Sequence, residues 1–294
     1  MAYMPIRWTV WDGNDWAPVQ QISSQYVTSQ VPALAAYPSD SSSGTQRLYC
    51  IYESQGELRC TSAKDPASDW DMERSSTSLK LNNGPGAIPY KPIGGDNELL
   101  HTVYSDPAAS KAWATSSGLC SWSSPSPLTF GGEWSARIAM ANYQGNLIVV
   151  QGSTKLAGQS YDGTDWKDLP GLNAHLAQGS PDLQVFDDEL YCIRPLKNTR
   201  LCYTIFDGDG WSEDRDAIVA TNPPTVPSLG LFEESTMMCV YTDDSSKYLM
   251  YTSTTDGKKW DQPAPIREGQ SDQPKGWGTL LHYDGLLYCA YQPV

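Results

Sequence analysis

The sequence has no long apolar run and few basic residues. Lys and Arg total 20 against 34 Asp and Glu, so the formal net charge at pH 7 is −14. Without an apolar run of about 20 residues, no helix that spans a membrane is expected. Nucleic acids and anionic membranes bind basic surfaces, so the acidic balance argues against both as partners. We expect a soluble protein with neutral or cationic partners.

Motifs for catalysis and for cofactor binding are also missing. The three His residues share no spacing typical of metal ligands. No Ser-His-Asp pattern, phosphate-binding loop or dinucleotide motif occurs. Adjacent carboxylates such as Asp187-Asp188 and Glu233-Glu234 fall in expected hairpin turns, where Asp and Glu are usually solvated. We therefore expect no enzyme activity, no metal and no cofactor.

The cysteine pattern indicates buried thiols rather than a disulfide framework. The seven Cys are an odd number, and none of their spacings is typical of a zinc site. Four of them share one position in a repeated pattern, where a small apolar residue is expected; they are Cys50, Cys192, Cys239 and Cys289. Two disulfides stay open, Cys50 with Cys60 and Cys192 with Cys202, since each pair would face across a hairpin.

The first residues bear on the location of the protein. Residues 1–7, Met-Ala-Tyr-Met-Pro-Ile-Arg, lack the basic start and the apolar stretch of a signal peptide. The expected location is therefore the cytoplasm, or outside the cell by a non-classical export route.

What the sequence does have is a repeated turn, Asp-Gly followed by Trp. The clearest copy is Tyr-Asp-Gly-Thr-Asp-Trp at 161–166, with further copies at 206–211, 255–260 and 11–16. Degenerate copies end at Trp70 and Trp122. Asp-Gly favours a tight turn, because Asp can accept bonds from nearby backbone and Gly tolerates positive φ. The Trp then offers a large apolar face to a neighbouring element.

The spacing of these Trp residues predicts a ring of six units. The series Trp16, Trp70, Trp122, Trp166, Trp211 and Trp260 has gaps of 54, 52, 44, 45 and 49 residues. From Trp260 through the two chain ends back to Trp16 is a further 50 residues. Four-stranded propeller blades repeat at about 40–50 residues. We expect these Trp residues to pack between blades rather than to bind a ligand.

Paired apolar runs supply the strands of each unit. A run that ends in an aromatic is followed by a polar turn and a second run, at 32–37 and 48–52, 88–93 and 99–104, 138–143 and 147–150, 183–186 and 190–193, 229–232 and 237–241, and 280–283 and 287–291. These are strands A and B; strand C precedes the Asp-Gly turn, and strand D begins at the Trp. Because A and B are apolar on both faces, each sheet must be covered on both sides.

The two ends of the chain complete one blade between them. The chain starts with a strand C and a strand D at 5–20, and it ends with a strand A and a strand B. Such a seam closes the ring and leaves no free edge. The predicted fold is all-β: a single six-bladed propeller domain over residues 1–294, with four antiparallel strands in each blade.

These features resemble the fungal fucose-binding lectins of the Aleuria type, which are six-bladed propellers. The resemblance spans the chain and is best at 46–59, followed by Trp70. In that family a strand B Arg and a strand C Glu hold the sugar hydroxyls, and aromatics of the neighbouring blade complete the pocket. Arg47 stands at the family's Arg position. The Glu position falls on residues that are not Glu, namely Trp8 or Arg7 in the closing blade, Tyr203 in the fourth, and Cys60, Gly158 and Thr252 in others.

The resemblance therefore implies Arg7, Trp8, Arg47 and Tyr203 as candidate sugar-binding residues. Five Trp lie outside the periodic series and could stack on a sugar ring; they are Trp8, Trp11, Trp113, Trp134 and Trp277. Of these, Trp8 is the first choice, because it falls at the family's sugar-contacting position beside Arg7.

The leading hypothesis is a carbohydrate-binding protein, a lectin, without catalysis. It would have repeated shallow sugar sites between blades, and glycans or glycoproteins as partners. One alternative is a sialidase-like glycoside hydrolase with one central pocket, because Asp-Gly-x-x-Trp also resembles a shortened Asp-box of sialidases. A second alternative is a protein-interaction scaffold, a common use of propellers.

Overall fold

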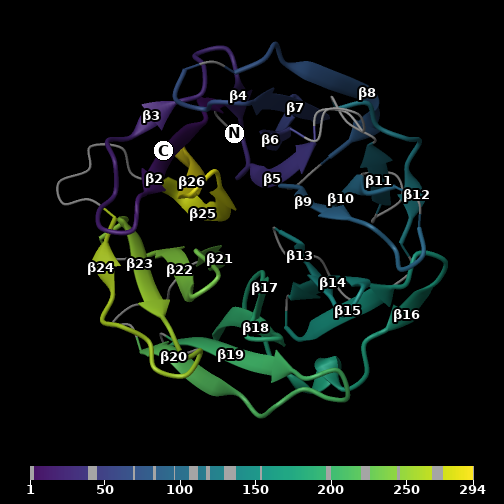
Figure 1. The fold of residues 1–294 in the computed structure, drawn as a ribbon, viewed down its shortest axis with the longest axis vertical. Coiled ribbons are helices and arrows are strands. Elements are labelled where there is room, and N and C mark those ends of the chain that lie inside the picture. Colours follow the sequence, from purple (N-terminus) through teal and green to yellow (C-terminus); the bar gives the residue numbers. More distant parts are fainter. Residues whose placement is uncertain are drawn as a thin grey trace.

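Six four-stranded antiparallel sheets stand around a central axis and form a closed ring (Figure 1). The structure is a computed structural model that describes residues 3–38, 45–68, 70–81, 84–95, 97–105, 112–116, 120–128, 137–152, 154–196, 200–219, 226–243, 246–266 and 274–293. It confirms the predicted all-β, six-bladed propeller. In the described residues no helix is both long and apolar enough to cross a membrane.

The blades are numbered in chain order, and the strands of each blade are given from the axis outward. Blade 1 contains β5 (Ala33–Pro38), β6 (Gln46–Ser54), β7 (Glu57–Ala63) and β8 (Arg74–Lys80). Blade 2 contains β9 (Gly86–Tyr90), β10 (Leu99–Tyr104), β11 (Ala112–Ser116) and β12 (Ser126–Pro127), and blade 3 contains β13 (Ala139–Tyr143), β14 (Asn146–Gly152), β15 (Leu156–Tyr161) and β16 (Trp166–Asp168). Blade 4 contains β17 (Asp182–Phe186), β18 (Glu189–Leu196), β19 (Arg200–Phe206) and β20 (Arg215–Val219). Blade 5 contains β21 (Ser228–Phe232), β22 (Thr236–Thr242), β23 (Leu249–Thr254) and β24 (Ala264–Pro265).

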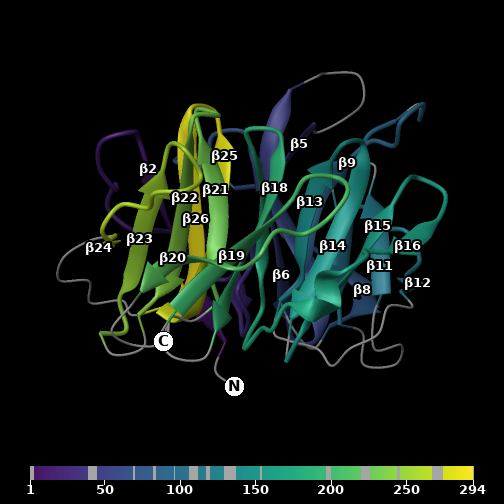
Figure 2. The ribbon, with the colours of Figure 1, turned by 90° about the horizontal axis from the view of Figure 1, so that it is seen from below.

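Blade 6 is built from both ends of the chain, as predicted. From the axis outward it contains β25 (Pro274–Tyr283), β26 (Leu286–Pro293), β2 (Arg7–Trp11) and β3 (Gln20–Gln21). The seam is the antiparallel pairing of β26 with β2. Both termini lie at one end of the ring (Figure 2), so the A–B and C–D turns of the blades lie at the other end. A small pair, β1 (Met4–Pro5) with β4 (Val27–Thr28), and the 3-10 helix η1 (Leu172–Ala174) complete the elements.

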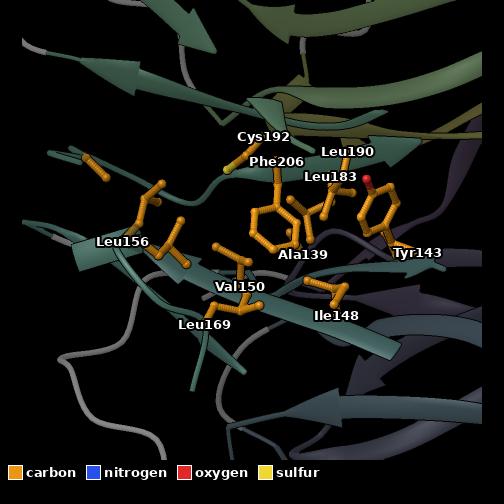
Figure 3. Close-up of a cluster of buried hydrophobic side chains, with 13 residues drawn as sticks. Ala139, Tyr143, Ile148, Val150, Leu156, Leu169, Leu183, Leu190, Cys192 and Phe206 are labelled. Atoms are coloured by element: carbon orange, nitrogen blue, oxygen red, sulfur yellow. The ribbon is translucent and has the colours of Figure 1, made fainter. Parts of the chain in front are cut away.

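The apolar core is divided into six clusters, and each cluster joins two neighbouring blades. Figure 3 shows the cluster between blades 3 and 4, where Ile148 and Val150 of β14 meet Leu190 of β18 and Phe206 of β19. Burial of both faces explains why strands A and B read as continuous apolar runs. The hydrophobic effect therefore acts between blades and holds the ring together.

The periodic Trp residues lie at these joints. Each one packs on the cluster that its own blade shares with the preceding blade; in blade order from 1 to 6 they are Trp70, Trp122, Trp166, Trp211, Trp260 and Trp16. Of the six periodic Trp residues, Trp16 is buried, with 3% of its surface exposed, and the other five are half-buried. The periodicity of the sequence is thus the periodicity of the joints between blades.

The Asp-Gly turn positions each Trp through backbone hydrogen bonds. In the copy at Asp162, the carboxylate Oδ1 accepts the backbone N–H groups of Thr164 and Asp165, both at 2.9 Å. Gly163 has φ +99°, which a residue with a Cβ rarely adopts. The same two bonds recur at the equivalent Asp of three other copies, Asp12, Asp207 and Asp256. These donors hold the pKa of each of the four carboxyls below its usual value.

The start of strand D differs from the prediction in five of the six blades. Only in blade 3 does strand D begin at the Trp, as β16 (Trp166–Asp168). In the other blades strand D begins four residues after the Trp, so that Trp16, for example, precedes β3 at Gln20. Between the Trp and strand D, the chain does not pair regularly with strand C, because the residue after the Trp is held by a different set of hydrogen bonds.

A buried Thr of strand C makes that set of bonds. Its hydroxyl donates to the carbonyl of the residue that follows the Trp, at 2.6–2.7 Å; the pairs are Thr9 with Ala17, Thr61 with Asp71, Thr204 with Ser212, and Thr252 with Asp261. The N–H of that same residue donates back to strand C, as in Asp261 to the carbonyl of Ser253 at 2.9 Å. The turn and the Trp are therefore fixed from both sides.

The two cross-strand disulfides that the sequence left open do not form. Cys50 lies opposite Thr61, and Cys192 lies opposite Thr204, so neither is in register with its expected partner. Both possibilities fail because the hairpins pair one to two residues away from the register that these disulfides would need. The five cysteines without a disulfide are all buried, as expected for small apolar residues; they are Cys50, Cys192, Cys202, Cys239 and Cys289.

One disulfide connects two blades. Cys60 of β7 is bonded to Cys120 in the C–D turn of blade 2, with the two Cα atoms 5.9 Å apart. We expect reduction of this bond to lower the free energy of unfolding by about 4 kcal/mol, since it closes a loop across a sequence separation of 60 residues and so restricts the unfolded chain. The melting temperature of the wild type should fall on addition of reductant. That of Cys120→Ala should start lower and should not respond to reductant; an equal response of both proteins would contradict the expectation.

Candidate functional site

A groove lies between blades 5 and 6, at the end of the ring that carries the A–B and C–D turns. Its volume is about 380 Å³. Blade 6 contributes Trp11 and Gly13, and blade 5 contributes side chains from its turn and strands, including Phe232, Glu233, Thr236, Tyr251, Ser253 and Asp261. We call this cavity the 5/6 groove.

Two half-buried aromatic rings form the apolar wall of the 5/6 groove. Trp11 ends β2, and Tyr251 lies on β23, with ring centroids 5.5 Å apart. The buried Trp16 lies behind both, at 5.7 Å from Trp11 and 5.8 Å from Tyr251. The joint between the blades thus fixes the two rings that line the groove.

The polar wall is formed by carboxylates and a hydroxyl of blade 5. Asp261 directly follows the periodic Trp260, and its backbone is held by Thr252 and Ser253. Its side-chain Oδ2 accepts the hydroxyl of Ser253 at 2.7 Å, which orients the carboxylate. Glu233 lies in the A–B turn with φ +48°. Both carboxylates are exposed to solvent.

The electrostatic character of the 5/6 groove is acidic. Burial raises the pKa of Tyr251, and the carboxylates of Asp15 and Asp261 raise it further. Among the described residues that line the groove, none is Lys, Arg or His. The groove can therefore stack on an apolar ring face and accept hydrogen bonds from hydroxyl or amine groups along the edge of that ring.

A second cavity lies on the axis and is smaller, at about 110 Å³. Residues of all six innermost strands or their flanks line it. Its charged groups are Arg137 and Asp182, which form an ion pair at 3.6 Å. Asp182 also accepts the Ser228 hydroxyl at 2.9 Å and the Leu229 N–H at 2.7 Å. The pair thus links neighbouring blades beside the axis. No described group of three or more potential metal ligands occurs here or elsewhere.

Arg47, the Arg at the lectin family's position, is held by its own blade. Its guanidinium forms an ion pair with Asp71 at 2.5 Å and donates to the Ser62 hydroxyl at 3.1 Å. Asp71 in turn accepts the Ser62 hydroxyl at 2.7 Å. The side chain of Arg47 is 19% exposed.

The other three sequence candidates lie in different environments. Trp8 is 4% exposed and stacks on Tyr288 in the joint between blades 6 and 1. Tyr203 is 2% exposed and stacks on Tyr191 in the joint between blades 4 and 5. Arg7 is half-buried beside Trp8 on β2. Arg7 adjoins Trp8 in sequence, but its side chain points to the opposite face of β2, and Arg47 and Tyr203 lie in other blades. The structure therefore does not gather the four residues into one site, and a sugar contact for any of them stays a prediction.

Trp11 was one of five Trp residues outside the periodic series, and the sequence did not single it out. Side chains alternate along a strand, so Trp8 and Val10 face blade 1, whereas Trp11 faces blade 5. A usable signal was present, because Trp11 directly precedes Asp-Gly, where the chain reaches the open end of the ring. Of the other Trp residues, Trp113 stacks on His101 at 5.7 Å, Trp277 is half-buried on β25, and Trp134 lies outside the described residues.

Comparison with solved structures finds the same fold in two fungal proteins, one of which is a lectin. AofleA from Arthrobotrys oligospora matches with a TM-score of 0.66 at 14% identity, over 90% of this chain and 80% of the other. A variant of the Aleuria aurantia lectin, in complex with α-methyl-L-fucoside, matches with a TM-score of 0.65 at 11% identity, over 90% of this chain and 88% of the other. The structure therefore resembles the Aleuria-type lectins, as the sequence suggested, at the level of the fold.

The same fold is also found in an enzyme. A sialidase described as Hadza microbial sialidase matches with a TM-score of 0.58 at 11% identity, over 90% of this chain and 65% of the other. No protein-family model and no curated protein sequence matches the chain. At these identities the comparisons show the six-bladed architecture, and the function must be argued from the side chains.

Proposed function

We propose that this protein is a carbohydrate-binding protein without catalytic activity, and that its principal sugar site is the 5/6 groove. The observation that carries the proposal is the combination of an aromatic wall, Trp11 with Tyr251, and hydrogen-bonding groups, Asp261 and Glu233, in one groove of about 380 Å³. Pockets of about 300–1,000 Å³ that join an apolar wall to a few polar groups are typical of small-ligand sites. The Aleuria aurantia lectin, which has the same fold and is solved in complex with α-methyl-L-fucoside, supports a sugar as the ligand.

The central cavity gives less support to a sialidase-like hydrolase. Its volume of about 110 Å³ is below the usual range for a ligand pocket. Arg137 is the one arginine among its described lining residues, and Asp182 already neutralises it. The carboxylate of Asp182 also accepts hydrogen bonds from Ser228 and Leu229, so Asp182 is not placed as a free acid or base.

The partners in this proposal are glycans or glycoproteins. A groove open to solvent on one side gives modest affinity at a single site. Further sugar sites at other joints of the same chain would raise the apparent affinity through avidity, without any new contact within a site.

A glycan array tests the proposal, with Trp11→Ala as the informative variant. The wild type should bind a defined group of glycans. Trp11→Ala should weaken that binding about tenfold or more, because it removes the stacking face of the groove. Trp113→Ala, which removes another half-buried indole from blade 2, should bind as the wild type does. A folded wild type that binds no glycan, or a Trp11→Ala variant with unchanged binding, would contradict the proposal.

A further inference from the structure

Blades 1 and 5 contain the same polar motif. In each of these blades, strand C contains the pair Thr-Ser, and the residue after the periodic Trp is Asp. Ser62 donates to Asp71 Oδ2 at 2.7 Å in blade 1, and Ser253 donates to Asp261 Oδ2 at 2.7 Å in blade 5. The two carboxylates are therefore held at equivalent positions by equivalent bonds.

The two blades differ at the residue that faces this carboxylate. In every blade one residue of strand B lies directly opposite the aromatic that ends strand A. From blade 1 to blade 6 these residues are Arg47, Leu99, Asn146, Glu189, Thr236 and Leu286. In blade 1 the guanidinium of Arg47 reaches Asp71 and neutralises it. In blade 5 the equivalent Thr236 has no positive charge and a much shorter side chain.

The 5/6 groove lies where Arg47 would extend if it stood in blade 5. Thr236 and Asp261 both line this groove. Glu233 adds a second carboxylate to the lining, and Asp15 lies close enough to act on Tyr251 of the aromatic wall. In blade 1 the guanidinium of Arg47 occupies the equivalent space and neutralises Asp71. In the 5/6 groove this space is open, and Asp261 has no such cation among the described lining residues.

We propose that the 5/6 groove binds an amino sugar, with the protonated amine of the ligand at the Asp261 carboxylate, in the place that the Arg47 guanidinium takes in blade 1. This inference rests on the proposed sugar-binding function and names the class of sugar. The ring of the ligand stacks on Trp11 and Tyr251. A charged hydrogen bond to a carboxylate is stronger than a neutral one, so the amine decides between otherwise identical sugars. Acidic sugars are disfavoured by like charge.

The test compares two forms of one oligosaccharide. A tetrasaccharide of β-1,4-linked glucosamine and its fully N-acetylated form are titrated into the whole protein by calorimetry at about pH 6, where amines are protonated and exposed carboxylates are ionised. The free-amine form should bind about tenfold or more tightly than the acetylated form. This preference should shrink as salt is added, because the contributing charges are near the surface.

Three variants locate the effect. Asp261→Asn keeps the shape of the side chain and should remove the preference for the free amine, while binding of the acetylated form is kept. Thr236→Arg copies blade 1 and should abolish binding of both forms, since the new guanidinium fills the groove and pairs with Asp261. Asp71→Asn, in blade 1, is the matched control and should leave the preference unchanged. Melting curves establish that each variant is folded.

The outcomes separate the inference from the proposed function. Equal binding of both forms, or a preference that survives Asp261→Asn, would overturn the amino-sugar assignment while sugar binding in the groove stands. Absence of binding by both forms also overturns it, and the glycan array then decides whether neutral sugars bind through Trp11. A lysine oligomer that binds as tightly as the glucosamine tetrasaccharide would identify a site for any cation and would contradict the sugar part of the inference.

Discussion

Trp16→Ala is expected to lower the free energy of unfolding by about 4 kcal/mol, because it removes a large indole from a closed joint. Trp16 is 3% exposed and contacts both Trp11 and Tyr251 in the cluster between blades 5 and 6. Its indole N–H is buried and has no hydrogen-bond partner among the described residues, so the loss comes from packing. Chemical denaturation measures the change directly.

Trp11→Ala is the matched comparison for this prediction. The two indoles are neighbours, with ring centroids 5.7 Å apart, yet Trp11 is only half-buried and faces the groove. Its removal should cost clearly less stability than the removal of Trp16, while it should cost more sugar binding than any change on the far side of the ring. If the two variants lost equal stability, the division between a structural Trp and a ligand-facing Trp would be incorrect.

Asp214→Ala is expected to lower the free energy of unfolding by about 3 kcal/mol, because it leaves a buried guanidinium without its counter-charge. The side chain of Arg194 is 0% exposed, and its Nη2 lies 2.5 Å from Asp214 Oδ1. His175 Nδ1 lies 2.6 Å from the same oxygen. This loss of about 3 kcal/mol is at the lower end of the usual range for breaking a buried ion pair, since the side chain of Asp214 is 34% exposed and water screens part of the interaction.

Another ion pair of the same blade supplies the control. Arg200 and Asp216 lie 3.0 Å apart, with side chains 50% and 43% exposed. Asp216→Ala should therefore change the free energy of unfolding by only about 0–1 kcal/mol. Comparable losses from Asp214→Ala and Asp216→Ala would show that burial of Arg194 does not govern the energetics.

The pair at Asp214 also predicts a pH dependence. Burial acts to raise the pKa of this carboxyl, but hydrogen bonds from Arg194 and His175 outweigh burial and hold the pKa below its usual value. A carboxyl with a lowered pKa stabilises the fold above its unfolded pKa, and that stabilisation is lost as pH falls through the folded pKa. Asp214→Ala should lack this part of the acid sensitivity, so the stability difference between variant and wild type should narrow in acid.

The ring could be predicted from the sequence because its determinants are local and repeated. An Asp-Gly turn such as that of Asp162 needs only its own backbone, and the Trp that follows marks one joint per blade. The closure of blade 6 followed from counting strands at the two ends, and the pairing of β26 with β2 confirms it.

The disulfide and the groove could not be predicted because they depend on contacts between blades. Cys60 and Cys120 belong to different blades and to different positions within the repeat, so no pattern along the chain pairs them. The choice of Trp8 followed the position of a family motif, whereas the alternation of side chains along β2 turns Trp8 inward and directs Trp11 toward blade 5. A shift of one residue in this alternation exchanges a ring buried in a joint for a ring that lines the groove.

The central claim is that the joint between blades 5 and 6 holds a sugar, and a crystal structure with the tightest-binding glycan of the array tests it most directly. The account predicts electron density for a sugar ring against Trp11 and Tyr251, with polar contacts to Asp261. Density for the sugar in the central cavity beside Arg137, or at another joint with the 5/6 groove empty, would contradict it.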